Sequence, residues 1–127
     1  YPAIEKIVEY NLLALTIINV KKADKPELLS HAKLNKVLVD CKEVKGDIYD
    51  KAAILLRGLI KGHVFASGNR RTALIVTKYF VNSNKGKFMI KDDPKQSKVM
   101  TGIREDFYTP QEIKEWIQNG KIREFKR

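Results

Sequence analysis

Apolar residues recur at helical spacing in several segments of the chain, a periodicity typical of helices with one buried face. The first segment spans residues 4–20 and is apolar enough to predict a central helix. A second helix is expected to open at Pro26, because proline is favoured in the first turn of a helix. Its apolar positions are Leu28, Leu29 and Ala32, and Leu38 is a candidate for the same face.

The middle of the chain predicts two further helices joined by a turn. Asp47 and Asp50 stand near the start of the first, where acids interact favourably with the helix dipole. Its apolar face consists of Leu55, Leu56, Leu59 and Ile60. Gly62 is expected to end it as a left-handed C-cap. The turn Ser67-Gly68-Asn69 offers N-cap side chains to the next helix. The inner face of that helix consists of Ala73, Val76, Thr77, Phe80 and Val81.

The last third of the chain is less regular. Residues 82–86 break the helical pattern, and residues 87–91 alternate briefly, as in a short extended segment outside any sheet. A helix is expected within residues 99–107, with Gly102 as a candidate interruption. Thr109-Pro110-Gln111-Glu112 is a capping box that predicts a last helix ending at Asn119-Gly120. The basic tail, residues 121–127, is expected to be frayed.

The predicted fold is all-α, a compact helical bundle of about six helices forming a single domain over residues 1–127. A hydrophobic content of 43% in 127 residues is enough for a sizeable core. No internal repeat is present. No apolar run is long enough to span a membrane, so no membrane partner is expected.

The formal charge of +10 implies attraction to polyanions, acidic proteins or nucleotides. The lysines are spread along the chain and do not alternate with aromatic residues as in single-strand binders, so nucleic acid is not the expected partner. The single cysteine, Cys41, cannot form an internal disulfide, which fits a reducing cytoplasm. We expect Cys41 to fill space in or near the core.

The segment between the two middle helices holds the candidate chemistry. Arg70 and Arg71 fall in the first turn of a helix, where an exposed cation opposes the dipole by about 0.3–1 kcal/mol. The first-turn amides also lack partners, so one bound anion relieves both problems, and phosphate is the usual anion there. His63 is the neighbouring titratable group. The pattern therefore predicts a phosphate-binding site with an imidazole beside it.

This segment resembles the signature of the Fic/Doc family, which in words is His-x-Phe-x-acid-Gly/Ala-Asn-Gly/Lys-Arg. The matching residues are His63, Phe65, Gly68, Asn69 and Arg71. The trailing Thr72-Ala73-Leu74 is similar to the death-on-curing (Doc) branch. Arg70 stands where that branch commonly has lysine and the Fic branch has glycine. The similarity extends loosely over residues 47–86.

The resemblance implies a role for each matching residue. His63 would be the general base that takes the proton of a target hydroxyl, and the alternative is a capping or core histidine. Asn69 is either an anion-hole donor or only an N-cap, and Arg70 either binds phosphate or faces water. Phe65 is a hydrophobic anchor of the loop in both interpretations. The implied phosphate-binding set is Gly68, Asn69, Arg70 and Arg71, with Arg71 as the bidentate ligand.

One position departs from the signature. The family has an acid there that holds magnesium against the nucleotide phosphates, and here the residue is Ser67. A hydroxyl supplies an oxygen but no charge, so the metal site is expected to be impaired, with Ser67 as a weak ligand or a helix cap. Asp92 and Asp93 are candidates to replace the acid through space, although turn formation explains them well enough.

We therefore expect a Doc-like toxin that transfers a phosphoryl group, or a nucleotide monophosphate, from a nucleoside triphosphate to a protein hydroxyl. The resemblance implies ATP as co-substrate, magnesium, and a small antitoxin chain as partner in the cytoplasm. The family's self-inhibitory motif has no full match, because residues 101–106 come near but end in Asp106. The alternative is a catalytically degenerate nucleotide-binding or protein-binding module, which Ser67 favours. His31 has no such context and is expected at the surface.

Overall fold

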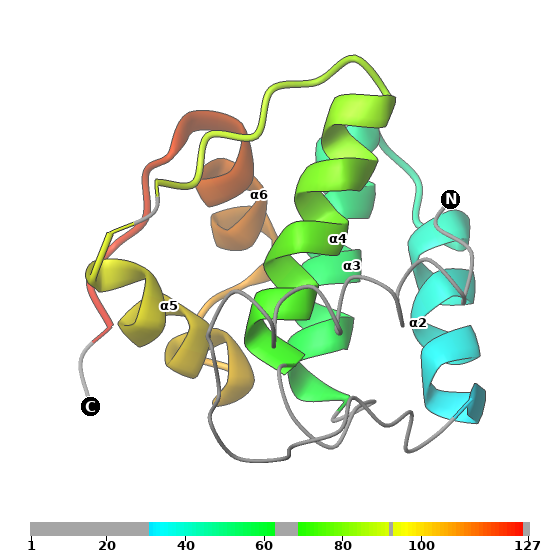
Figure 1. Ribbon diagram of the computed structural model, residues 1–127, viewed down its shortest axis with the longest axis horizontal. Helices are drawn as coiled ribbons and strands as arrows, with labels where there is room; N and C mark the ends of the chain where they lie inside the picture. Colours follow the sequence, from blue (N-terminus) through cyan, green and yellow to red (C-terminus); the bar gives the residue numbers. More distant parts are fainter. Residues whose placement is uncertain (1–30, 63–68, 92, 126–127) are drawn as a thin grey trace, which may run out of the picture.

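The computed structural model describes residues 31–62, 69–91 and 93–125, and these ranges contain five α-helices and no strand (Figure 1). The helices are α2 (His31–Glu43), α3 (Ile48–Lys61), α4 (Asn69–Ser83), α5 (Lys95–Arg104) and α6 (Pro110–Asn119). The predicted all-α class is confirmed. The helix predicted for residues 4–20 and the predicted start at Pro26 lie outside the described residues. None of the described helices is long and apolar enough to cross a membrane.

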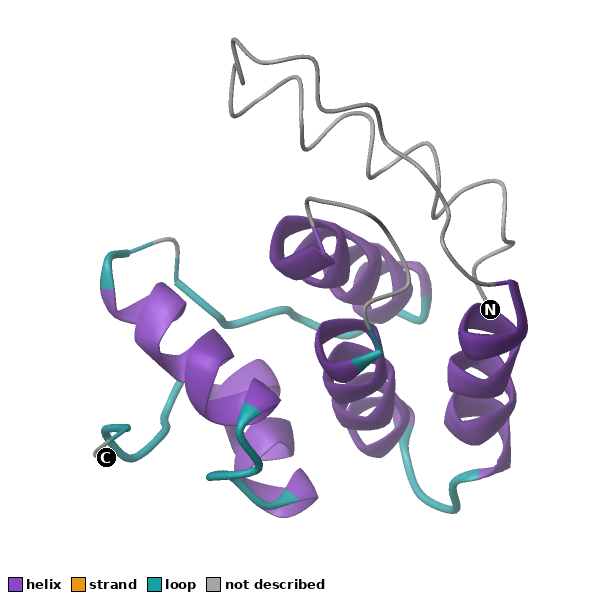
Figure 2. Cartoon of the chain, turned by 90° about the horizontal axis from the view of Figure 1, so that it is seen from below, coloured by secondary structure: helices purple, strands orange, loops and turns teal. Residues whose placement is uncertain are grey.

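α3 is the central helix of the described part and contacts each of the other four. α2 lies on one side of it and α5 and α6 lie on the other, an arrangement that the view from below also shows (Figures 1 and 2). The buried side chains of α3 are Ala52, Ala53, Leu55, Leu56, Leu59 and Ile60. These residues occupy more of the helix surface than the predicted apolar face, and a helix that is apolar on most sides takes a central position.

α3 begins with a capping box made by two aspartates. The Asp47 carboxylate accepts hydrogen bonds from the backbone N–H groups of Tyr49 (2.9 Å) and Asp50 (3.1 Å), and the Asp50 carboxylate accepts one from the Asp47 N–H (2.9 Å). Lys114 of α6 pairs with Asp50 at 3.1 Å and with Asp47 at 3.8 Å. Burial alone would raise the pKa of Asp50, but hydrogen bonds from Lys114 and the Asp47 backbone outweigh it and lower that pKa. The predicted helix start is confirmed, and it also anchors α6.

The end of α3 corrects one prediction. Gly62 is the C-cap, as expected, and its N–H donates to the Gly58 carbonyl at 2.9 Å. Its φ of −75° and ψ of −16° are right-handed, however, so the chain leaves α3 with helical geometry and not through a left-handed turn. The left-handed cap lies at Gly120 after α6, with φ 72° and ψ 13°. A Cβ at Gly120 would also lie 2.8 Å from the Met89 carbonyl oxygen.

α5 begins earlier than predicted and is not interrupted. It runs from Lys95 to Arg104, straight through Gly102. Gly102 is buried, and a Cβ there would overlap the Tyr108 ring and lie 3.1 Å from the Phe125 ring. The glycine therefore allows aromatic side chains to approach the helix backbone closely, and it does not mark a break. α6 matches its prediction, with Thr109 in a capping box with Glu112.

α2 is held on α3 by Leu34, Val37 and Cys41, all of which are buried. Gly58 of α3 allows the close approach, because a Cβ there would lie 2.8 Å from the Val37 side chain. Cys41 has no exposed surface, and burial raises the pKa of its thiol to about 11. The expectation that Cys41 fills space in the core is confirmed.

The chain after α6 contradicts the expectation of a frayed tail for residues 121–125. The Tyr108 hydroxyl donates to the Arg123 carbonyl at 2.9 Å. The Arg123 guanidinium forms an ion pair with Glu112 and lies 4.0 Å from the centroid of the Phe107 ring. The Phe125 ring meets the Phe107 ring edge-on, with centroids 4.9 Å apart. Aromatic contacts hold this segment, and helical periodicity contains no signal for them. Residues 126–127 lie outside the described part.

Residues 86–91 have no regular secondary structure, which agrees with the prediction that residues 87–91 lie outside any sheet. The Met89 N–H donates to the Ile117 carbonyl of α6 at 2.9 Å. The Lys87 N–H donates to the Tyr49 hydroxyl of α3 at 2.9 Å. The segment thus connects α4 to α5 across the ends of α3 and α6.

Candidate functional site

The signature residues lie between two helices that pack against each other. α3 ends at Lys61 and α4 begins at Asn69, and the two helices are in contact along their length. The expected general base His63, the anchor Phe65, the metal candidate Ser67 and the phosphate candidate Gly68 lie outside the described residues. Asn69 is the first residue of α4, and its side chain is outside the described part. Of the predicted site, the structure describes the side chains of Arg70 and Arg71.

The first turn of α4 is a cationic helix N-terminus. Its first turn contains no acid, while Arg70 is half-buried and Arg71 is exposed. Neither guanidinium forms an ion pair with a carboxylate of the described residues. Two cations at the positive end of a helix dipole are unfavourable unless an anion joins them. The described part of the protein supplies no such anion, which leaves this position suited to a phosphate.

The buried face of α4 fixes the direction in which these arginines project. All five predicted inner residues are buried: Ala73, Val76, Thr77, Phe80 and Val81. Thr72 is buried beside Ala73, so the helix is packed from its first turn onward. Because Arg71 lies just before these two residues, it is held on the opposite, solvent-facing side. The predicted inner face of this helix is confirmed.

The last turns of α3 are tied to the turn between α5 and α6. Asp106 accepts a hydrogen bond from the Arg57 Nη2 at 3.0 Å and forms an ion pair with Lys61. The hydrogen bonds from Lys61 and Arg57 lower the pKa of Asp106. This cluster could not be predicted from the sequence, since its members have no spacing that relates them. Lys61 directly precedes Gly62, so the cluster fixes the point where the chain enters the signature segment.

Asp106 also bears on the near match to the self-inhibitory motif. Residues 101–104 belong to α5, and the Asp106 carboxylate is bound to Arg57 and Lys61 of α3. It forms no ion pair with Arg70 or Arg71, the arginines that an inhibitory carboxylate would have to reach. The described structure therefore gives this segment a different role, which is to hold the end of α3.

No group of three or more metal-ligating side chains occurs in the part of the chain that the structure describes. The Asp93 carboxylate accepts a hydrogen bond from the Lys95 N–H at 2.9 Å and so caps the start of α5. This supports the turn explanation for Asp93, while Asp92 lies outside the described residues. For His31, the structure gives only its place as the first residue of α2.

The sequence around this site matches a protein-family model. Residues 20–81, just under half of the chain, match the model of the Fic/DOC family. Over these residues the chain is similar to the Fic/DOC family. The match covers α2, α3, the signature segment and most of α4, and it ends at Val81. The Fic/DOC resemblance noted from the signature is thereby supported over a longer stretch of sequence. A search of curated proteins finds no significant match to the chain.

Proposed function

We propose that this protein is a transferase of the Fic/Doc type, which moves a phosphoryl group or a nucleotide monophosphate from a nucleoside triphosphate to a protein hydroxyl. The observation that carries the proposal is the family match over residues 20–81, which includes the whole signature. The described geometry supports it, because the two arginines of the signature stand at a helix N-terminus without a carboxylate partner among the described residues. ATP is the proposed donor.

The transfer is an in-line displacement at phosphorus. The oxygen of the target hydroxyl forms a bond to the phosphorus, and the bond to the bridging oxygen of the leaving group breaks. His63 takes the hydroxyl proton, for which an imidazole is suited at neutral pH. The leaving group is the nucleoside diphosphate if the terminal phosphate moves, and pyrophosphate if the nucleotide monophosphate moves.

Arg70 and Arg71, with the backbone around Gly68 and Asn69, would bind the phosphates. Guanidinium groups bind phosphate oxygens bidentately and offset the charge that builds up on them during transfer. The similarity of Thr72-Ala73-Leu74 to the Doc branch favours phosphorylation over nucleotidyl transfer. In this proposal the cationic first turn of α4 is unfavourable in the empty protein and becomes favourable when nucleotide is bound.

Ser67 decides how well this site would work with magnesium. Magnesium bound to the phosphates neutralises part of their charge, and the family acid that would hold it is replaced here by a hydroxyl. Three outcomes remain open at this position. The protein works slowly, or the metal enters on the nucleotide alone, or the chain is a degenerate binding module of the same fold.

The proposed partners are a target protein that presents a hydroxyl and a small antitoxin chain that covers the site. Asp106 is engaged with α3, and this favours inhibition by a separate chain over inhibition by residues 101–106. The proposed location is the cytoplasm.

The test is incubation of the protein with labelled ATP, magnesium and a cell lysate. We expect labelled proteins with the parent chain and none with His63→Ala. His31→Ala is the matched control, since it removes the only other histidine and should leave labelling intact. Labelling by Ser67→Asp but not by the parent would identify the natural chain as degenerate. Labelling that survives His63→Ala would remove the proposed mechanism.

A further inference from the structure

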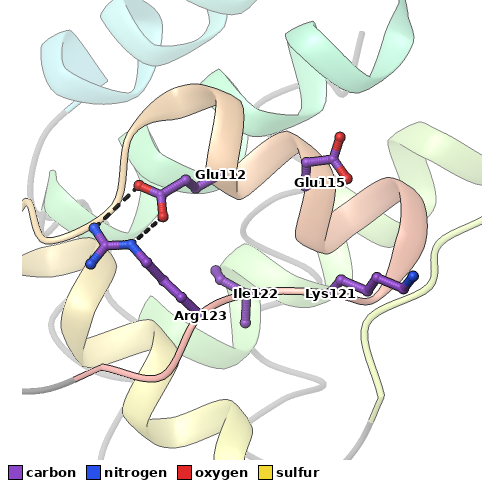
Figure 3. Close-up of a pocket in the computed structure, with 5 residues that line it drawn as sticks. All are labelled: Glu112, Glu115, Lys121, Ile122 and Arg123. Carbon is purple, nitrogen blue, oxygen red and sulfur yellow. Dashed lines mark hydrogen bonds and ion pairs between the residues drawn. The ribbon is translucent and has the colours of Figure 1, made fainter.

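The segment 121–125 lies between α5 and α6, and pockets flank it on both sides. Ile122 lines all of them. On the α6 side, a pocket of about 350 Å³ is lined by Glu112, Glu115 and Arg123, among others. Figure 3 shows Glu112 facing the Arg123 guanidinium, with which it is paired, while Glu115 points away from it. The positive charge of Arg123 is therefore balanced on this side.

On the α5 side, two pockets share lining residues and together form one groove. Their volumes are about 350 and 260 Å³, and they share Lys95, Val99 and Ile122. We call this combined hollow the α5 groove. Val99 and Ile122 belong to both of its halves, and Phe125 closes one end of its apolar lining. Because the two halves share lining residues, an extended ligand can occupy both, with Ile122 as the partly exposed apolar residue common to them.

The groove is rimmed by lysines: Lys91, Lys95, Lys98 and Lys121. None of the four forms an ion pair within the described part of the chain. Two acids also line the groove, Asp93 and Glu124. The Asp93 carboxylate accepts a hydrogen bond from the Lys95 N–H at the start of α5 and keeps its negative charge. Among the described residues, the four lysines outnumber the two acids, so the rim is predominantly positive.

We propose that the α5 groove binds an extended acidic segment of a partner protein. Apolar side chains of that segment would lie on the partly exposed Ile122 and Phe125, and its carboxylates would meet the lysines of the rim. All of these residues lie beyond residue 81, where the family match ends, and none belongs to the signature. The inference therefore stands independently of the proposed transfer reaction.

The groove favours this occupant over the two obvious alternatives. A second copy of the chain has a formal charge of +10 and would be repelled by the rim. Single-stranded nucleic acid gains much of its affinity by stacking bases on exposed aromatic faces. The Trp116 side chain beside the groove is only 5% exposed and offers no such face.

The test is fluorescence anisotropy with a short labelled peptide in which Glu and Leu alternate. We expect Lys95→Glu/Lys121→Glu to weaken binding by at least about tenfold, because two attractions become repulsions. The matched control is Lys45→Glu/Lys78→Glu, which makes the same change of charge at two exposed lysines outside the groove. Glutamate is favourable at Lys95, the first position of α5, and mildly unfavourable at Lys121, just past the C-terminus of α6, so neither change is expected to unfold the protein.

Two further probes complete the test. A peptide with Ser in place of Leu should bind at least about tenfold more weakly, because it cannot use the apolar lining. A labelled oligonucleotide should compete poorly at physiological salt. The proposal is overturned if both double variants weaken binding equally, if the Ser peptide binds as well as the Leu peptide, if no peptide binds, or if the oligonucleotide displaces the peptide through the same lysines. Self-association that Lys95→Glu/Lys121→Glu abolishes would overturn it in favour of a second copy.

Discussion

Asp106 and Arg57 form a hydrogen bond of 3.0 Å across 49 positions of sequence. The same carboxylate pairs with Lys61, so one side chain in the turn after α5 holds the last two turns of α3. Asp106 has a φ of 61°, a left-handed conformation that aspartate and asparagine tolerate better than most residues. Position 106 therefore needs a residue that tolerates a left-handed backbone and also a negative charge for Arg57 and Lys61. A substitution that changes only the charge can separate these two requirements.

Asp106→Asn removes the charge and keeps the backbone tolerance. Because its partners lower the pKa of Asp106, the folded value lies below the unfolded value of about 3.9. The stability contributed by the charge is present above the unfolded value and is lost as pH falls through the folded one. We expect the variant to be less stable than the parent at neutral pH and equal to it at acid pH, as measured by urea denaturation. A difference that persists at acid pH would assign the effect to the backbone.

Gly102→Ala tests whether the glycine of α5 is required by packing. The new Cβ would overlap the Tyr108 ring and crowd Phe125, so we expect a loss of about 1–3 kcal/mol in the free energy of unfolding. Helix propensity alone would predict a gain of about 1 kcal/mol, so the sign distinguishes the two explanations. Ser97→Ala, at an exposed position of α5, is the control and should be neutral or slightly stabilising.

Local rules predicted the helix ends well where the capping side chain is a near neighbour. Asp47 and Thr109 open α3 and α6 as expected, because both capping boxes are complete within four residues. Contacts between distant residues were not predictable in this way. The uninterrupted path of α5 through Gly102 and the position of segment 121–125 both depend on Phe107, Tyr108 and Phe125, which meet only in the folded chain.

The same distinction applies to the candidate site: features set by local spacing were predictable, and contacts between distant residues were not. The buried face of α4 was predictable from apolar spacing, whereas the exposure of Arg71 is seen only in the structure. The ion pair between Lys61 and Asp106 could not be predicted from the sequence. The two residues lie far apart along the chain, and a charged surface residue can pair with many different partners. The role of His63 as general base was inferred from the family resemblance, because the periodicity of apolar residues contains no information about catalysis.

Thr77→Val is expected to stabilise the protein. The Thr77 hydroxyl is fully buried on α4 and has no hydrogen-bond partner among the described residues. A buried hydroxyl without a partner costs about 1–3 kcal/mol, and valine has nearly the same shape without the polar atom. We expect urea denaturation to show a gain of about 1 kcal/mol. Thr101→Val is the matched control, since the Thr101 hydroxyl donates to the Ser97 carbonyl at 3.1 Å and its removal should bring no gain.

Arg71→Gln should change stability and nucleotide binding in opposite directions. The exposed Arg71 cation opposes the dipole of α4, so its removal should raise the free energy of unfolding of the empty protein by about 0.3–1 kcal/mol. The same change removes a phosphate ligand, and binding of a fluorescent ATP analogue should weaken by about tenfold or more. Lys78→Gln, an exposed cation in the middle of α4, is the control and should change neither quantity appreciably. A variant that is both less stable and unchanged in binding would mean that Arg71 pairs with a group of the protein itself, and the first turn of α4 would then have no need of a phosphate.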